Sequence, residues 1–280
     1  MKINFIWAAL GQFFFLGSQW FVLLVMARLG NPTMLGEYSL ALAIVVPIIA
    51  LGEMQLTQLQ ITDIDNVFSL KDYFLFRIVA LLVCFCAVLV ILLLFDTEDI
   101  KLIIFIFIAR AFASIGEISY GYFQSKEKFK KLSIIKSLRG VISFISIIIP
   151  LYLNLNLIDI VICYTIASIL IFFTFEYRSI RVKIKSSGYL RFSAFKKIFY
   201  LSFPLGLSNG VNSLTANIPK YFLSHYFGLE VVGYFTIVSS PITWLLLIPG
   251  VMSQVILPRA AFYFHKQLKT EYLSLFLKYT

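Results

Sequence analysis

Two ionisable residues, Arg110 and Glu117, lie seven positions apart in an apolar stretch long enough to cross a membrane. Seven residues are close to two helical turns, so both side chains project to within about 20° of one face. A charged residue at the centre of a spanning helix costs about 2.5 to 3.5 kcal/mol on insertion scales unless it faces a cavity or a partner. Arg110 is therefore a candidate contact for a phosphate or sugar, which its planar guanidinium can bind in bidentate fashion. The alternative is an ion pair between Arg110 and Glu117 or Glu53 that only holds the helices together and does not bind substrate.

The carboxyl groups of Glu53 and Glu117 are candidates for coupling transport to a proton. A buried carboxylic acid can take up and release a proton during a transport cycle. The position of Glu117 nearer the inner end of its span also fits a carboxylate that is simply solvated.

A second candidate wall is a polar stripe on one helical face of residues 199–224. The stripe consists of Ser202, Asn209, Ser213 and Lys220, and Asn217 and Gly206 flank it. A polar stripe in an apolar span faces protein or water rather than lipid. We therefore assign Asn209, Ser213, Asn217 and Lys220 to a substrate lumen. The alternative is hydrogen bonding between helices, which contributes about 0.6 kcal/mol per contact.

Arg28, at the outer end of the first span, is a candidate substrate contact or an interfacial anchor. Aromatic residues near span ends, namely Trp7, Tyr38 and Tyr120, are interpreted as interface anchors.

Membrane-spanning helices must position these residues, and the composition of the chain predicts such helices. The chain is 60% hydrophobic and only 14% charged, with a mean hydropathy of +0.90. About 20 apolar residues cross a bilayer as a helix. The predicted spans are residues 5–29, 37–61, 75–95, 101–122, 133–153, 158–177, 199–224 and 231–256. Pro204 and Pro219 are predicted to break the seventh span near both ends. The fold class is therefore an all-α integral membrane protein with about eight transmembrane helices.

The loops between these spans carry a strong charge asymmetry. Most of the 24 Lys and Arg residues fall on one side: Lys2, Lys71, Arg77, the run from Lys126 to Arg139, the run from Arg178 to Lys197, and Arg259, Lys266, Lys269 and Lys278. The outer loops hold only Arg28 and Lys101, while Arg110 and Lys220 lie inside spans. Because Lys and Arg near helix ends stay in the cytoplasm, the N-terminus is predicted to be cytoplasmic.

Composition also argues against several classes of function. The net charge of +10 accompanies apolar spans, so membrane orientation and anionic lipid explain it without nucleic acid. Cys84, Cys86 and Cys163 lie within spans and predict neither a metal site nor a disulfide framework. The short loops leave no room for a soluble catalytic domain. We therefore expect no metal, no cofactor and no enzymatic activity.

An internal repeat relates two turns about 200 residues apart. The first contains Gly30, Gly36 and Tyr38, followed by Pro47, which interrupts the second span; the later turn contains Gly228, Gly233 and Tyr234, followed by Pro241. A unit of six helices keeps its orientation when repeated, so the halves are predicted to be parallel repeats. Residues 1–198 form a six-helix lobe with its inward loop, and residues 199–280 form the first two helices of a second lobe and a polar tail. Four helices of the second half are therefore expected to be absent, unless the repeat is coincidental and eight helices are the complete design.

The chain resembles Wzx-type flippases, the O-antigen and capsule members of the polysaccharide-exporter branch of the multidrug and toxin extrusion superfamily. The residues that carry the resemblance are Gln12, Ser18 and Gln19, the turn from Gly30 to Tyr38, Gly52-Glu53, Gln124-Ser125-Lys126-Glu127 and Leu201-Ser202-Phe203-Pro204-Leu205. The resemblance implies two helical bundles that move undecaprenyl-diphosphate-linked oligosaccharide across the bacterial inner membrane. It also implies membrane lipids and other glycan-assembly membrane proteins as partners.

Three alternatives to the flippase hypothesis stay open at this point. A cation-coupled multidrug antiporter of the same superfamily would share the fold, although basic lumen residues argue against it. A membrane enzyme such as a glycan polymerase would need a large outer loop or a catalytic residue set. A transport-inactive fragment would follow from the missing helices.

Overall fold

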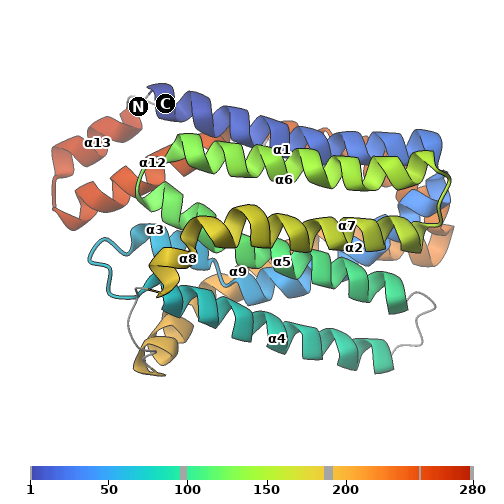
Figure 1. Ribbon diagram of the computed structural model, residues 1–280, viewed down its shortest axis with the longest axis horizontal. Coiled ribbons are helices and arrows are strands. Elements are labelled where there is room, and N and C mark those ends of the chain that lie inside the picture. The colour runs from blue at the N-terminus through green and yellow to red at the C-terminus, as the bar shows by residue number, and fades with distance from the viewer. Residues whose placement is uncertain (1, 95–99, 186–191, 246, 278–280) are drawn as a thin grey trace.

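The protein is an all-helical bundle in which most helices run nearly parallel (Figure 1). The computed structural model describes residues 2–94, 100–185, 192–245 and 247–277. The elements are α1 (Lys2–Leu29), α2 (Pro32–Glu53), α3 (Leu56–Thr62), α4 (Leu70–Leu94), α5 (Ile100–Ser125), α6 (Phe129–Tyr152), α7 (Leu157–Ile171), the π-helix η1 (Phe172–Tyr177), α8 (Arg178–Lys185), α9 (Phe192–Phe227), α10 (Leu229–Ser239), α11 (Ile242–Leu245), α12 (Leu247–His265) and α13 (Lys269–Leu277).

The predicted class, an all-α integral membrane protein, is confirmed. Seven helical stretches among the described residues are long and apolar enough to cross a membrane: 3–29, 32–62, 70–94, 100–125, 129–152, 157–185 and 247–265. Helix α9 is the longest element, with 36 residues, but its polar stripe places it outside this group. The first six predicted spans therefore correspond to α1, α2 with α3, α4, α5, α6, and α7 with η1 and α8.

The prediction of one continuous eighth span over residues 231–256 is wrong. The helix ends at Ser239, before Pro241, and resumes as α11 and then α12. Proline lacks the amide hydrogen that a helix interior uses, so a break there is expected. The break brings Trp244 against α1, where Trp20 Nε1 also donates a hydrogen bond to Ser240 Oγ at 3.0 Å.

Three other prolines do not interrupt their helices, contrary to the prediction. Pro47 lies inside α2, and Pro204 and Pro219 both lie inside α9, which runs without a break. In hydrocarbon, every backbone group released by a broken helix needs another partner. A continuous helix that loses single hydrogen bonds at prolines therefore costs less than an open break.

The bundle is held together by close contacts along its helices. Helix α1 lies beside α6, and small residues on both helices make the approach possible (Figure 1). A Cβ at Gly140 would lie 2.6 Å from Ser18 Oγ, and one at Gly11 would lie 2.7 Å from the Cα of Ser133. Close approach through small residues is a common way to pack helices in lipid, where apolar burial gives little drive for association.

Helices α2 and α10 cross at a reciprocal pair of glycine contacts. A Cβ at Gly36 would overlap the carbonyl of Leu229, and a Cβ at Gly233 would overlap the carbonyl of Pro32. Each glycine lies one turn into its helix, and each contacts the first residue of the other helix. The same sequence spacing separates Gly36 from Gly233 as separates Pro32 from Leu229.

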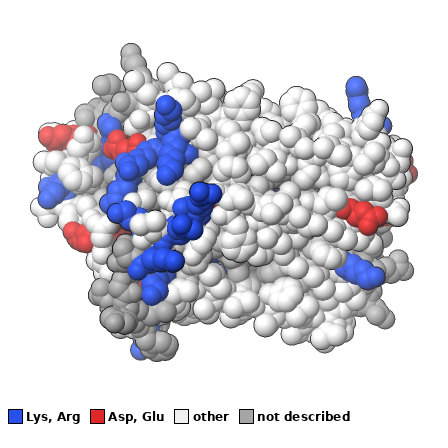
Figure 2. Space-filling view, in the orientation of Figure 1, with Lys and Arg blue, Asp and Glu red and all other residues white. Residues whose placement is uncertain are grey.

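On the face drawn in Figure 2, most Lys and Arg side chains lie towards one end of the bundle. Figure 2 shows Lys and Arg gathered near the end that holds both chain termini, while a broad uncharged band covers the middle of this face. An uncharged band between polar ends is the surface expected of a protein that sits in a bilayer.

Candidate functional site

Two adjoining cavities open inside the bundle. The first, which we call the cationic cavity, has a volume of about 190 Å³, and its lining includes Gln19, Tyr38, Ser39, Arg110, Arg139, Ser143, Tyr164 and Lys220. The second, which we call the mixed-charge cavity, has a volume of about 110 Å³, and its lining includes Glu53, Arg110, Ser114, Glu117, Tyr120 and Arg139. Arg110 and Arg139 belong to both linings and so lie where the cavities meet.

Arg110 and Lys220 converge on the cationic cavity from opposite parts of the sequence. Arg110 lies on α5 and Lys220 on α9. Within the described parts of the chain, neither residue has an acidic group within the 4.0 Å of an ion pair. The Nε atom of Arg110 is buried and has no hydrogen-bond partner there. The predicted alternative, an Arg110 ion pair with Glu117 or Glu53, is therefore not formed.

The mixed-charge cavity brings Glu53 and Glu117 together with Arg110. Glu53 ends α2, whereas Tyr38 of the cationic cavity lies near the start of that helix, so the two cavities follow one another along the bundle. Both carboxylates are half-buried. A carboxylate in this position can hold a proton or a small cation beside the arginines.

Of the polar residues on this face of α9, only Lys220 lines either cavity. Asn209 donates from Nδ2 to the carbonyl of Ala50 at 3.3 Å, and Asn217 donates to the carbonyl of Ser213 at 2.9 Å. The Asn209 contact is the interhelical hydrogen bond that the sequence left as an alternative, whereas the Asn217 bond lies within α9. Arg28 is exposed at the end of α1 and lies in neither cavity lining.

Three further cations lie inside the bundle, although the charge count assigned them to the cytoplasmic side. Arg77 is 1% exposed and donates from Nη1 to Ser114 Oγ at 3.1 Å. Lys136 donates to Gln12 Oε1 at 3.1 Å. Arg139 is 3% exposed. All three residues lie within α4 or α6 and not in a loop, so they do not belong among the cations of the inward loops.

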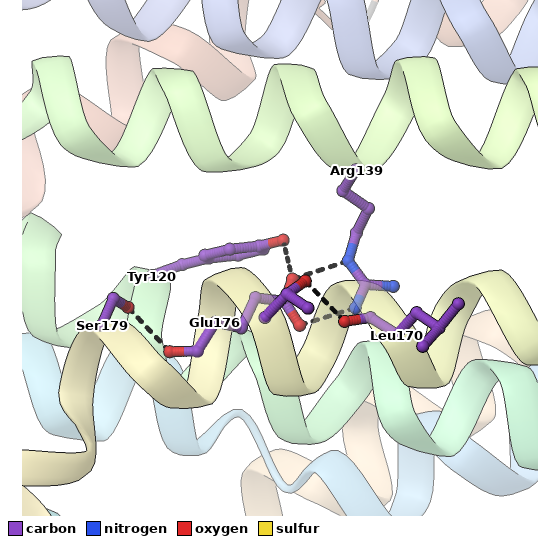
Figure 3. A network of polar contacts seen from close by, with 6 residues as sticks. Tyr120, Arg139, Leu170, Glu176 and Ser179 are labelled. Carbon is purple, nitrogen blue, oxygen red and sulfur yellow. Dashed lines mark hydrogen bonds and ion pairs between the residues drawn. The ribbon is translucent and has the colours of Figure 1, made fainter.

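Arg139 forms a buried bidentate ion pair with Glu176, which the sequence interpretation missed. Its Nε and Nη2 atoms donate to the two carboxylate oxygens at 2.6 Å each, and the Tyr120 hydroxyl donates to Oε1 at 2.6 Å. Figure 3 shows Arg139 reaching from α6 towards η1, with the ring of Tyr120 lying beside the pair. The signal available in the sequence was an unexplained acidic residue, Glu176, inside the sixth predicted span.

Local backbone features make room for this pair. A Cβ at Gly116 on α5 would overlap the Glu176 carboxylate, so a side chain there would displace the carboxylate. Glu176 lies in the π-helix that joins α7 to α8. Single π-helical turns occur within α-helices and are frequent at functional sites.

Two tyrosines that were predicted to anchor the membrane interface are instead buried. Tyr38 is 4% exposed and lines the cationic cavity, and Tyr120 is 6% exposed and binds Glu176. The Glu176 carboxylate holds the Tyr120 hydroxyl in the interior, and the Tyr38 side chain faces the cationic cavity.

The arrangement favours binding of an anion over catalysis of a covalent step. The cationic cavity presents Arg110, Lys220 and Arg139, and no carboxylate lines it in the described ranges of the chain. Guanidinium groups suit phosphate through parallel charge-assisted hydrogen bonds. No group of three or more potential metal ligands occurs in the part of the chain that the structure describes.

Comparison with known proteins places the chain among polysaccharide biosynthesis proteins. The model of that family matches residues 2–264. The capsular polysaccharide biosynthesis protein CapF of Staphylococcus aureus is 28% identical over 260 residues, covering 91% of this chain and 64% of CapF. The chain thus spans less than two thirds of the length of that curated relative. No solved structure matches it. Because the family match extends over nearly the whole chain, and agrees with the resemblance carried by its turns and helix ends, the chain belongs to the polysaccharide biosynthesis protein family.

Proposed function

We propose that this chain is part of a transporter that moves undecaprenyl-diphosphate-linked oligosaccharide across the bacterial inner membrane, with its N-terminus in the cytoplasm. The observation that carries the proposal is the convergence of Arg110 and Lys220 on one cavity, with no acidic group in ion-pair range among the described residues. An unpaired cation in a spanning helix is costly unless it faces water or a ligand. The anionic diphosphate is the part of such a substrate that these side chains would bind.

The cavity fits this substrate better than it fits a cationic drug. Cations repel one another across a medium of low dielectric constant, so a cavity lined by Arg110 and Lys220 disfavours a positively charged ligand. In the proposed cycle, Glu53 and Glu117 of the mixed-charge cavity take up the proton or cation that drives transport. The polyprenyl tail stays in lipid, and no bond of the substrate is made or broken.

Alternating access needs two lobes that move around a shared site. The reciprocal contacts of Gly36 and Gly233 support assignment of residues 1–198 and 199–280 to two parallel repeats, because two equivalent helices then meet on one axis. Lys220 would supply the second repeat's contribution to the cavity. Export would require the protein to provide the rest of that repeat.

Neutral substitutions at the two unpaired cations test the proposal. We expect Arg110→Gln and Lys220→Gln, each in the full-length protein, to lower surface polysaccharide by about tenfold while the protein remains at its normal level in the membrane, since a hydrogen bond to a charged group contributes about 1.5 to 3 kcal/mol. The readouts are surface glycan by antibody binding and lipid-linked oligosaccharide retained in the membrane.

Lys101→Gln is the matched control for lost positive charge. Lys101 is exposed at the start of α5 and lies in neither cavity lining, so its replacement should leave export unchanged. Normal surface glycan in both the Arg110→Gln and Lys220→Gln strains would refute the assignment of the cavity to substrate.

A further inference from the structure

Arg139 is held by Glu176 in a way that leaves one nitrogen outside the ion pair. Glu176 binds Nε and Nη2, so the carboxylate lies along one edge of the planar guanidinium. Nη1 takes no part in this pair. The Arg139 side chain is only 4% exposed, but it lines both cavities. Nη1 is therefore the nitrogen that the edge-on pair leaves to face the cavities.

The surroundings of Glu176 fix the direction of that nitrogen. The Glu176 side chain is 0% exposed and accepts three short hydrogen bonds, one of them from Tyr120. Gly116 leaves space for the carboxylate on α5, and the π-helix turns Glu176 towards α6. Three elements, α5, α6 and η1, thus meet at the Glu176 carboxylate, and their contacts fix its position.

We propose that Glu176 is a positioning residue that aims Nη1 of Arg139 into the cationic cavity, where it contacts the anionic headgroup together with Arg110 and Lys220. This inference rests on the proposed function, because it takes the cavity as the substrate site. It assigns Arg139, which the sequence placed with the cytoplasmic charges, to binding of the diphosphate. A paired arginine keeps its remaining N–H donors, so neutralisation by Glu176 lowers the cost of burying the cation without removing it from the ligand.

Exchanging Arg139 and Glu176 distinguishes a role of the pair in binding the headgroup from a role in stabilising the fold alone. In the double variant Arg139→Glu/Glu176→Arg, the buried ion pair can re-form, but the donor on α6 is replaced by a carboxylate. The measurement is the Kd of farnesyl diphosphate, a soluble diphosphate probe with a short polyprenyl tail, for the full-length protein in nanodiscs, together with the thermal unfolding temperature. We expect an unfolding temperature near that of the parent and binding weaker by at least about tenfold, as loss of a charge-assisted contact predicts.

The reversed pair Arg259→Glu/Glu127→Arg is the matched control. Arg259 and Glu127 also form a bidentate pair, with Nε and Nη2 donating at 2.9 and 2.7 Å, but both lie outside the cavity linings. This exchange should leave the Kd unchanged. Glu176→Asp adds a finer readout, because it keeps the charge but withdraws the carboxylate by one methylene, and we expect it to weaken binding less than the reversal does.

Parental affinity in the Arg139→Glu/Glu176→Arg variant would overturn the positioning role while leaving the substrate cavity intact, provided that Arg110→Gln still weakens binding. Parental affinity in both Arg110→Gln and Lys220→Gln would instead overturn the proposed function. If the reversed pair does not accumulate in the membrane, the neutral double variant Arg139→Gln/Glu176→Gln is judged by the same Kd criterion. Failure of both double variants to fold would assign the pair to folding alone and overturn the inference.

Discussion

The two bidentate Arg–Glu pairs of this protein have nearly the same geometry but lie in different surroundings. The Arg139–Glu176 pair has side chains that are 4% and 0% exposed, while those of the Arg259–Glu127 pair are 27% and 37% exposed. The first pair connects α6 to η1 inside the bundle. The second connects α12 to the turn between α5 and α6, and both of its side chains are partly exposed. The comparison therefore separates the effect of burial from the effect of hydrogen-bond geometry.

Burial changes how much each pair contributes to the stability of the fold. Removing one partner of a buried pair leaves a desolvated charge and costs about 3 to 5 kcal/mol. An exposed pair contributes only about 0 to 1 kcal/mol, because water already solvates both groups and salt screens them. Two pairs of similar geometry are thus predicted to contribute unequally to stability, and three substitutions test this difference.

Glu176→Ala should have the largest effect on stability. The variant leaves Arg139 without its carboxylate and Tyr120 without its acceptor, so we expect a loss of about 3 to 5 kcal/mol in the free energy of unfolding. Unfolding of the purified protein in mild detergent, followed by tryptophan fluorescence, measures the loss. A change below 1 kcal/mol would mean that cavity water solvates Arg139 well enough to replace the pair.

Gly116→Ala should have an intermediate effect through the same pair. The added methyl group overlaps the Glu176 carboxylate, which must shift and loosen its bonds to Arg139 and Tyr120. Overpacking of a tight interior commonly costs about 1 to 3 kcal/mol. The thermal unfolding temperature in detergent should fall accordingly. Gly250→Ala serves as a control, because a Cβ at that position would meet no described atom within 4 Å other than its own chain neighbours and helix backbone.

Glu127→Ala should have the smallest effect and should depend on salt. The pair with Arg259 is partly exposed, so we expect a loss of about 1 kcal/mol or less at low ionic strength. The difference between variant and parent should shrink as ionic strength rises towards 1 M, where the screening length falls to about 3 Å. A larger, salt-independent loss would show that this pair behaves like the buried one.

The sequence predicted the membrane class and six of the helical regions because lipid imposes a simple requirement on composition. A spanning segment must be apolar for about 20 residues, and that requirement can be recognised without knowledge of neighbouring helices. The effects of proline were less predictable. Pro241 ends a helix, whereas Pro47, Pro204 and Pro219 do not, since the outcome depends on whether other groups can satisfy the freed backbone.

The candidate site was predicted only in part. Helical spacing identified Arg110, Glu117 and Lys220 as interior residues, and all three line a cavity. The same spacing assigned Asn209 and Asn217 to the lumen, but their amides bind backbone carbonyls. Periodicity shows that residues share a face of one helix, but it does not show which helix covers that face.

By itself, the sequence determined that the chain is a membrane protein, that most of its cations fall in the loops of one side, and that charged residues occur within its spans. Only the tertiary structure decided which of those charges are paired. Arg139 meets Glu176 across two helices, while Arg110 meets no acidic group within ion-pair distance among the described residues. The physical reason is that pairing depends on distances of a few ångströms between residues far apart in the chain, whereas solubility in lipid depends on each segment's own composition.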